Sequence, residues 1–193
     1  VAVMPLQSCG KCYYCKRGWR HLCQNYTGTG LAWYWGGFAE YSMLKEYQLR
    51  KIPDNMSFKD AACIEPCALA AYSVDRGNVG AGDNVLITGG GPTAALTLMA
   101  CRAEGASNVY MTEVQPGRLK RLKQLGATEA FNPLEINLEE EILGRTDGLG
   151  VDVAIDCSGI ESAINDCFTL LRKRGTYVQS GLTVEKIKVD PYD

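Results

Sequence analysis

Residues 84–96 read NVLITGGGPTAAL, an apolar run that ends in three glycines and is followed by a second apolar segment. The segment NVLITGG (84–90) predicts a buried strand, and PTAALTLMACRAEG (92–105) predicts a helix that begins at Pro92, where a missing N–H is harmless. The glycines between them predict a tight turn. The stretch therefore predicts the strand–turn–helix opening of an α/β unit.

The same alternation continues towards the end of the chain. Further strands are expected at 108–114, 129–132, 151–159 and 176–181, and further helices at 116–126, 137–146 and 160–175. Gly105, Gly126 and Gly175 each follow a helical pattern, as C-terminal caps do. Strands and helices that alternate in this way predict a parallel sheet wrapped by helices, so the fold class is α/β.

The first 64 residues have a different sequence pattern, which predicts short strands separated by Gly-rich turns. Alternation in FAEYSML (38–44) and YQLRKIP (47–53) predicts half-buried strands of an antiparallel region. We therefore expect two domains, a mainly-β one over 1–64 and the α/β one over 65–193.

The glycine turn has the spacing of a dinucleotide-binding fingerprint. Gly89 allows the tight turn, Gly91 lets the backbone approach a pyrophosphate, and Ala94 takes the third position. Glu113 follows the next strand, where a carboxylate accepts both ribose hydroxyls of NAD and repels the 2′-phosphate of NADP. We expect NAD; the alternative is a Gly-rich turn of an ordinary α/β sheet.

Four of the nine cysteines lie in CGKCYYCKRGWRHLC (9–23), at Cys9, Cys12, Cys15 and Cys23. Four thiolates on a short, turn-rich backbone suit tetrahedral zinc, and a site with four protein ligands is closed and structural. Disulfides would strain such short loops, and a catalytic cysteine would need a base. The only histidine, His21, lies inside the cluster and is expected to be an exposed loop residue.

Composition limits the classes of partner. The net charge is −2 with a pI near 5.5 and no dominant basic patch, which disfavours nucleic acid, anionic membranes and a nucleic-acid-binding zinc module. No apolar run reaches the roughly 20 residues of a membrane span. The five other cysteines are scattered through expected helices and strands, as in a reducing compartment. We expect a soluble, cytoplasmic protein with a small-molecule partner.

Several motifs together resemble the zinc-dependent medium-chain dehydrogenases, in particular the branch of sorbitol, 2,3-butanediol and threonine dehydrogenases. They are the cysteine cluster, GGFAEY (36–41), IEP (64–66), GGGPTA (89–94), TEVQPGRLKRLKQLGA (112–127) and DCSG (156–159). The resemblance implies a GroES-like, mainly-β catalytic domain carrying two zincs, followed by a Rossmann-type domain that binds NAD.

The resemblance also implies roles for individual residues. The four cysteines of the cluster would bind the structural zinc. The residues at the dinucleotide would be Gly89, Gly91, Pro92 and Thr93 in the turn, Glu113 at the adenosine ribose, Arg118 beside that ribose and the adenine, and Ser158, Gly181 and Leu182 at the nicotinamide half. Those last three follow strand ends, where ligands of parallel sheets bind.

Glu65 matches the family's acidic residue at the catalytic zinc, either as a direct ligand or through water. The alternative is an ordinary Glu before a helix that Pro66 starts. The family takes further zinc ligands, a Cys and a His followed by Glu, from a segment before the cysteine cluster. We therefore expect this chain to be an internal fragment, which also lacks the sixth Rossmann strand.

For the complete enzyme the resemblance implies hydride transfer between a secondary alcohol or polyol and NAD, in a homo-oligomer, either dimer or tetramer. The alternative is that the fragment is a non-catalytic zinc- and NAD-binding module. Trp33, Tyr34 and Trp35 are candidates for the wall of a substrate pocket, or for ordinary packing.

Overall fold

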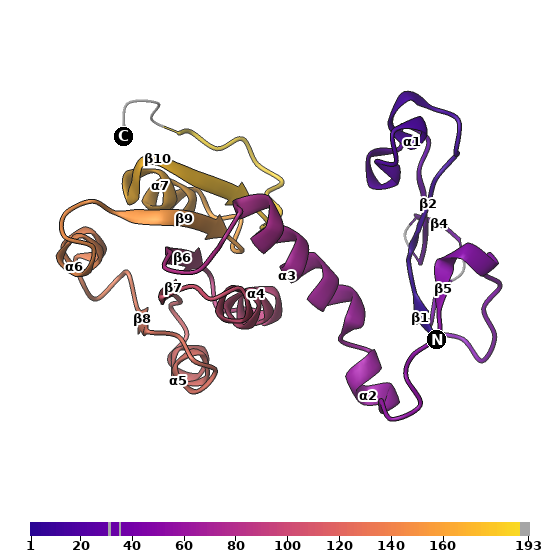
Figure 1. Ribbon diagram of the computed structural model, residues 1–193, viewed down its shortest axis with the longest axis horizontal. Coiled ribbons are helices and arrows are strands. Elements are labelled where there is room, and N and C mark those ends of the chain that lie inside the picture. Colours follow the sequence, from indigo (N-terminus) through magenta and orange to yellow (C-terminus); the bar gives the residue numbers. More distant parts are fainter. Residues whose placement is uncertain (31, 35, 190–193) are drawn as a thin grey trace. The chain divides into compact units, whose positions relative to one another are not determined.

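The computed structural model describes residues 1–30, 32–34 and 36–189 (Figure 1). The chain divides into two compact units, Val1–Glu65 and Pro66–Asp193. Each unit is described by itself.

The second unit is built on a five-stranded parallel sheet. Its strands are β6 (Asn84–Thr88), β7 (Asn108–Thr112), β8 (Glu129–Phe131), β9 (Val151–Asp156) and β10 (Leu171–Gln179), and their order is β10-β9-β6-β7-β8. This is the Rossmann order: all strands are parallel, and the order in which the chain adds strands reverses between the neighbours β6 and β9. The expected α/β fold class is confirmed, and ligands of such sheets bind at the carboxyl ends of the two strands that flank this reversal point.

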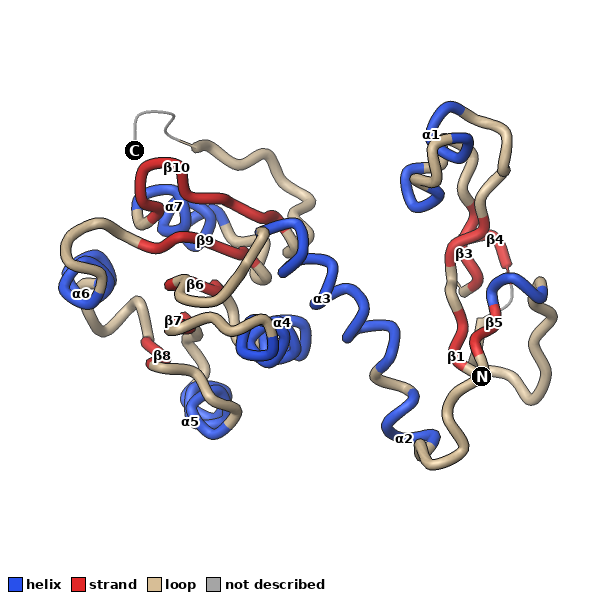
Figure 2. The backbone as a smooth tube through the Cα atoms, in the orientation of Figure 1, coloured by secondary structure: helices blue, strands red, loops and turns tan. Residues whose placement is uncertain are grey.

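Helices cover both faces of this sheet (Figure 2). They are α3 (Ile64–Gly77), α4 (Pro92–Ala103), α5 (Pro116–Gln124), α6 (Leu138–Arg145) and α7 (Glu161–Thr169). One core joins α3, α4 and α5 to one face of the sheet, around Leu98 and Ile87, and the other joins α6 and α7 to the opposite face, around Ile142 and Leu86. The three central strands β9, β6 and β7 are mostly apolar and buried because both of their faces are covered.

The helix ends follow the expected caps with one exception. Gly105 and Gly126 have φ of +91° and +102°, the left-handed conformation of a C-terminal cap. The expectation for Gly175 is wrong: α7 ends at Thr169, and Gly175 lies inside β10. The pairing register of β10 with β9 shifts between Leu171 and Thr176, and a Cβ on Gly175 would lie 2.5 Å from Leu171 Cδ2. Glycine at position 175 therefore makes room for the irregular pairing of β10 with β9 at this point.

The first unit contains two small sheets. β1 (Ala2–Val3) pairs with β5 (Leu49–Arg50), and β2 (Leu6–Gln7), β3 (Thr27–Thr29) and β4 (Ala32–Tyr34) form the other. Its helices are α1 (Tyr13–Lys16) and α2 (Phe58–Ala61), with 3-10 turns at Arg20–Leu22 and Glu46–Gln48. Gln48 is fully buried, and its side-chain amide donates to the Met4 carbonyl and to Thr29 Oγ1. This one amide therefore links the two sheets.

The expected strand over 38–44 is wrong, because these described residues form no strand. Phe38, Tyr41 and Met43 lie with their side chains almost fully exposed. Alternation alone does not make a strand when no neighbouring strand pairs with it.

Candidate functional site

The turn between β6 and α4 is shaped by Gly89. Its φ is +93°, and its N–H donates to the Thr112 carbonyl at 2.9 Å. A Cβ here would lie 3.4 Å from Ser158 Cβ, so the turn runs close to the loop that follows β9. Both the positive φ and the close approach favour glycine.

Helix α4 begins directly after this turn. Gly91 is its N-cap and gives no side-chain cap, and Pro92 occupies the first turn as expected. The first N–H groups of the helix are therefore left for another acceptor, and such a helix start binds phosphate groups. A Cβ on Gly91 would meet no described atom within 4 Å, so the protein itself does not require glycine there.

Glu113 lies immediately after β7, with its side chain only 6% exposed. Its Oε1 accepts hydrogen bonds from the N–H groups of Val114 and Gln115, at 2.7 and 2.9 Å, and its Oε2 pairs with Arg118 at 3.3 Å. Burial acts to raise the pKa of Glu113, but the N–H groups and Arg118 outweigh it and lower that pKa. Glu113 is thus held as a carboxylate.

Gly90 is a site residue that the sequence reasoning missed. A Cβ at this position would lie 2.6 Å from Glu113 Oε2 and 2.7 Å from its Cγ, closer than real contacts allow. Thr93, in the first turn of α4, is half-buried, and Arg118 is 57% exposed beside Glu113. The structure thus brings the glycine turn and the expected ribose-binding pair together.

The loops after β9 and β10 meet at the carboxyl end of the sheet. The Ser158 N–H and hydroxyl both donate to Asp156 Oδ1, and the Gly181 N–H donates to the Asp156 carbonyl at 2.7 Å. A Cβ on Gly181 would lie 2.4 Å from the Gly159 nitrogen, so glycine is required by close packing. Leu182 follows with 94% of its surface exposed.

Asp156 was also missed, although DCSG was noted as a motif. It is completely buried and organises both loops. The available signal was a carboxylate placed at the end of the apolar strand VDVAID, where it must find several donors to be tolerated.

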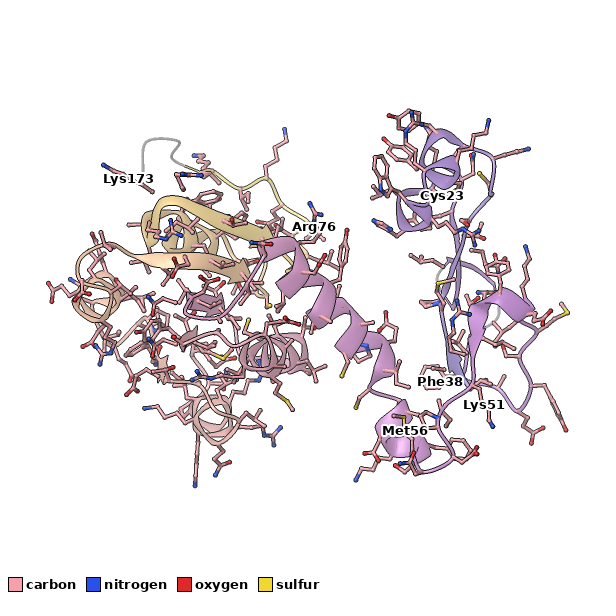
Figure 3. All side chains as sticks on the ribbon, viewed as in Figure 1. Cys23, Phe38, Lys51, Met56, Arg76 and Lys173 are labelled. Atoms are coloured by element: carbon pink, nitrogen blue, oxygen red, sulfur yellow. The ribbon has the colours of Figure 1, made fainter. Side chains whose placement is uncertain are left out.

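The four cysteines of the cluster converge in the first unit. Their Sγ atoms all lie within 4.8 Å of one another, and those of Cys12 and Cys23 are 3.9 Å apart. A tetrahedral site with Zn–S bonds of about 2.3 Å places its sulfurs about 3.8 Å apart, so the donor set and its spacing fit zinc. Cys23 is labelled in Figure 3.

Backbone N–H groups support these thiolates. The Cys9 N–H points to Cys23 Sγ at 3.3 Å. Hydrogen bonds from the backbone of Cys15 and Gln24 lower the pKa of Cys12 to about 6, whereas burial raises that of Cys15 to about 11. His21 is exposed in the 3-10 turn, and the cysteines form the only metal-type cluster found in the described ranges.

Glu65 is exposed in the first turn of α3, which begins at Ile64 rather than at Pro66 as expected. Glu65 is the last residue of the first unit and borders an open pocket of about 440 Å³, whose other lining residues, among them Val3 and Thr29, belong to the same unit. The expectations for Trp33, Tyr34 and Trp35 concern side chains that lie outside the described residues.

Comparisons with known proteins agree with both halves of the chain. Residues 92–193 match the zinc-binding dehydrogenase family, and residues 1–54 match the alcohol dehydrogenase GroES-like domain. D-xylulose reductase A of Aspergillus oryzae is 36% identical over 186 residues, which cover 94% of this chain and 52% of that protein. The chain thus spans about half the length of this curated relative.

Solved structures give the same result. A zinc-binding dehydrogenase of Sinorhizobium meliloti, bound to NADP, is 32% identical with a TM-score of 0.93, covering 99% of this chain and 57% of its own. A short chain alcohol dehydrogenase of Escherichia coli CFT073, complexed with NADH, is 28% identical with a TM-score of 0.90, covering 97% and 55%.

Within the described ranges, no helix is long and apolar enough to cross a membrane. The family match covers more than half of the 193 residues and confirms the resemblance carried by the motifs. The chain belongs to the zinc-binding dehydrogenase family.

Proposed function

We propose that the chain is part of a zinc-dependent oxidoreductase that transfers a hydride between a secondary alcohol or polyol and NAD. The observation that carries the proposal is the contact of the glycine turn with the buried carboxylate of Glu113 at the carboxyl end of a Rossmann-type sheet. The name of the A. oryzae relative supports a polyol or its ketose as substrate.

Residues of the second unit would hold the dinucleotide. The turn 89–92 and the first N–H groups of α4 would bind the pyrophosphate, and Glu113 would accept hydrogen bonds from the adenosine ribose. The Arg118 side chain would lie beside the ribose and adenine, and its ion pair with Glu113 would weaken when the ribose binds. Ser158, Gly181 and Leu182 would border the nicotinamide half, and Thr93 would face the pyrophosphate.

The choice of NAD over NADP rests on this chain's own carboxylate, since relatives with either cofactor are known. A 2′-phosphate would bring about two negative charges next to Glu113, whose lowered pKa keeps it ionised. The repulsion between this phosphate and the adjacent Glu113 carboxylate disfavours NADP.

Two zinc sites have different roles in the proposal. The cysteine cluster would hold a structural zinc, and Glu65 would act at the catalytic zinc, directly or through water. When bound, the catalytic zinc would supply Lewis-acid stabilisation of an alkoxide. Glu65 lies beside an open pocket, which leaves room for a substrate.

We also infer a homo-oligomer, a dimer or tetramer, on the family resemblance. None of the nine cysteines forms a disulfide, and all nine lie in the described ranges, which supports the reducing conditions of a cytoplasmic location.

The test assays the 193-residue chain beside a longer protein in which it is extended to the length of the curated relatives. We expect both to bind NADH, and the longer protein to oxidise NADH when D-xylulose or a related ketose is added. Replacing Glu65 by Gln should reduce turnover and leave NADH binding unchanged. A longer protein that binds NADH and zinc but turns over no member of a panel of ketoses and polyols would favour the non-catalytic module.

A further inference from the structure

Asp156 is a buried carboxylate that receives five hydrogen bonds. Oδ1 accepts from Thr88 Oγ1 at 2.8 Å and from the Ser158 N–H and hydroxyl at 3.0 and 2.6 Å. Oδ2 accepts from the Gly159 N–H at 2.9 Å and from Gln179 Nε2 at 2.7 Å. The residue has no exposed surface, so its charge is stabilised by these donors rather than by water.

The donors come from three different strand ends. Thr88 ends β6, Ser158 and Gly159 follow β9, and Gln179 ends β10. The Asp156 carbonyl adds the N–H groups of Ser180 and Gly181, at 2.8 and 2.7 Å. Asp156 therefore joins β6 and β9, the two sides of the reversal point, to the loop that leaves β10.

The position of Asp156 requires a side chain that only accepts hydrogen bonds, because every polar group facing it is a donor. Asp156 has no ion pair with Lys or Arg among the pairs found in the described ranges, so hydrogen-bond donors alone surround it. An amide of the same shape with its NH₂ group in place of Oδ2 would face the Gly159 N–H and Gln179 Nε2. The Gly159 N–H would then lose its acceptor, whereas Gln179 Nε2 would keep only the Gly181 carbonyl. Buried donors that lose their acceptor are destabilising, so the loops would have to move.

We propose that Asp156 is the positioning residue for the nicotinamide half of the dinucleotide site, because its carboxylate binds Ser158, Gly159 and Gln179, which hold the loops after β9 and β10. The inference rests on the proposed function, because the resemblance places the nicotinamide beside these loops. Asp156 itself touches no cofactor. Its carboxylate fixes the loops that would contact the nicotinamide.

The test compares two ligands on the zinc-loaded full chain. NADH needs both halves of the site, whereas ADP-ribose carries the adenosine ribose and pyrophosphate but no nicotinamide. Replacing Asp156 by Asn should weaken NADH binding at least about tenfold and remove the change in NADH emission on binding, while ADP-ribose affinity changes less than about twofold. Isothermal titration and NADH fluorescence measure the two effects.

Asp152→Asn is the matched control, because Asp152 lies near the opposite end of the same strand. Its carboxylate accepts from the Asn84 N–H at 2.8 Å and from Arg172 Nε at 2.5 Å, so its loss also disturbs β9 and β6. This variant should lower stability and leave the ratio of NADH to ADP-ribose affinity unchanged.

A second variant keeps the test decisive if Asp156→Asn does not fold. Gln179 is exposed, and Gln179→Leu removes the bridge by which Nε2 donates both to the Asp156 carboxylate and to the Gly181 carbonyl, without opening the core. This variant should also weaken NADH more than ADP-ribose.

The possible failures are distinguishable. A wild-type chain that binds no NADH overturns the proposed function. A wild-type chain that binds NADH, with variants that bind it equally well or lose NADH and ADP-ribose in proportion, overturns the positioning role of Asp156.

Discussion

A Cβ built on Gly90 would lie 2.6 Å from Oε2 of Glu113. The glycine turn and the carboxylate after β7 are therefore in direct contact, although they come from different strand ends. Because the Val114 and Gln115 N–H groups and Arg118 also hold this carboxylate, its position is set before any ligand arrives. Such pre-organisation lowers the entropy lost on binding.

Replacing Gly90 by Ala should damage both stability and binding. The new methyl group would force Glu113 away from its backbone donors, and overpacking of this kind destabilises a protein by about 1–3 kcal/mol. We expect NADH affinity to fall at least about tenfold as well, measured by fluorescence titration beside denaturant unfolding.

Gly144 gives the matched control for this substitution. It is exposed in α6, and a Cβ there would meet no described atom within 4 Å. Gly144→Ala should stabilise the helix by about 0.5–1 kcal/mol and leave NADH binding unchanged. If Gly90→Ala behaved like Gly144→Ala, the contact with Glu113 would have no energetic role.

Glu113 should make stability depend on pH in a defined direction. Its pKa in the folded chain lies below the ordinary value of 4.5, so the folded state favours the ionised form. The stabilisation is therefore fully present above the unfolded-state pKa and is lost as the pH falls through the folded-state pKa. Arg118 is the charged group that pairs with it.

Urea unfolding of the wild type and of Glu113→Gln measures this effect as a difference. The free energy of unfolding of the wild type should exceed that of the variant at pH 7, and the gap should narrow as the pH falls below the ordinary Glu pKa of 4.5 and through the lower pKa of the folded state. A gap that widens on acidification would contradict the assignment of Glu113 as the stabilising carboxylate.

The cysteine cluster should hold about one zinc per chain by elemental analysis. Cys12→Ser should lose the metal because Cys12 Sγ is one of the four converging sulfurs, whereas Cys63→Ser should keep it because Cys63 is exposed outside the cluster. A second tightly held zinc in the chain would contradict the expectation of one site, which rests on the cysteine cluster being the only group of metal ligands found among the described residues.

Removal of this zinc should affect the two units differently. The four cysteines lie in Val1–Glu65, whereas the residues proposed for the dinucleotide lie in Pro66–Asp193. Chelation should therefore reduce the circular dichroism of the first unit and change NADH affinity by less than about twofold. Loss of NADH binding on chelation would show that the metal supports more than its own lobe.

The α/β half could be predicted from the sequence because its signals are local and repeated. NVLIT and VDVAID are mostly apolar runs of strand length, Pro92 marks a helix start, and glycines mark two helix ends. The cysteine spacing likewise predicted the four-sulfur cluster that the structure shows. Each of these signals lies within about a dozen residues.

The predictions failed where the local structure is decided by contacts with residues far away in the sequence. LRKRG after α7 has the composition of a helix end, yet Leu171 pairs with Val151 of β9 and begins a strand. FAEYSML alternates correctly but has no partner strand. Gly90 and Asp156 were missed because their reasons, the Glu113 side chain and five donors from three strand ends, lie far away in the sequence.

The most direct test of the central claim is a fluorescence titration of the wild-type chain with NADH and with NADPH under the same conditions. The account predicts that NADH binds at least about tenfold more tightly, because the ionised Glu113 repels a 2′-phosphate. Equal affinities, or tighter binding of NADPH, would contradict it.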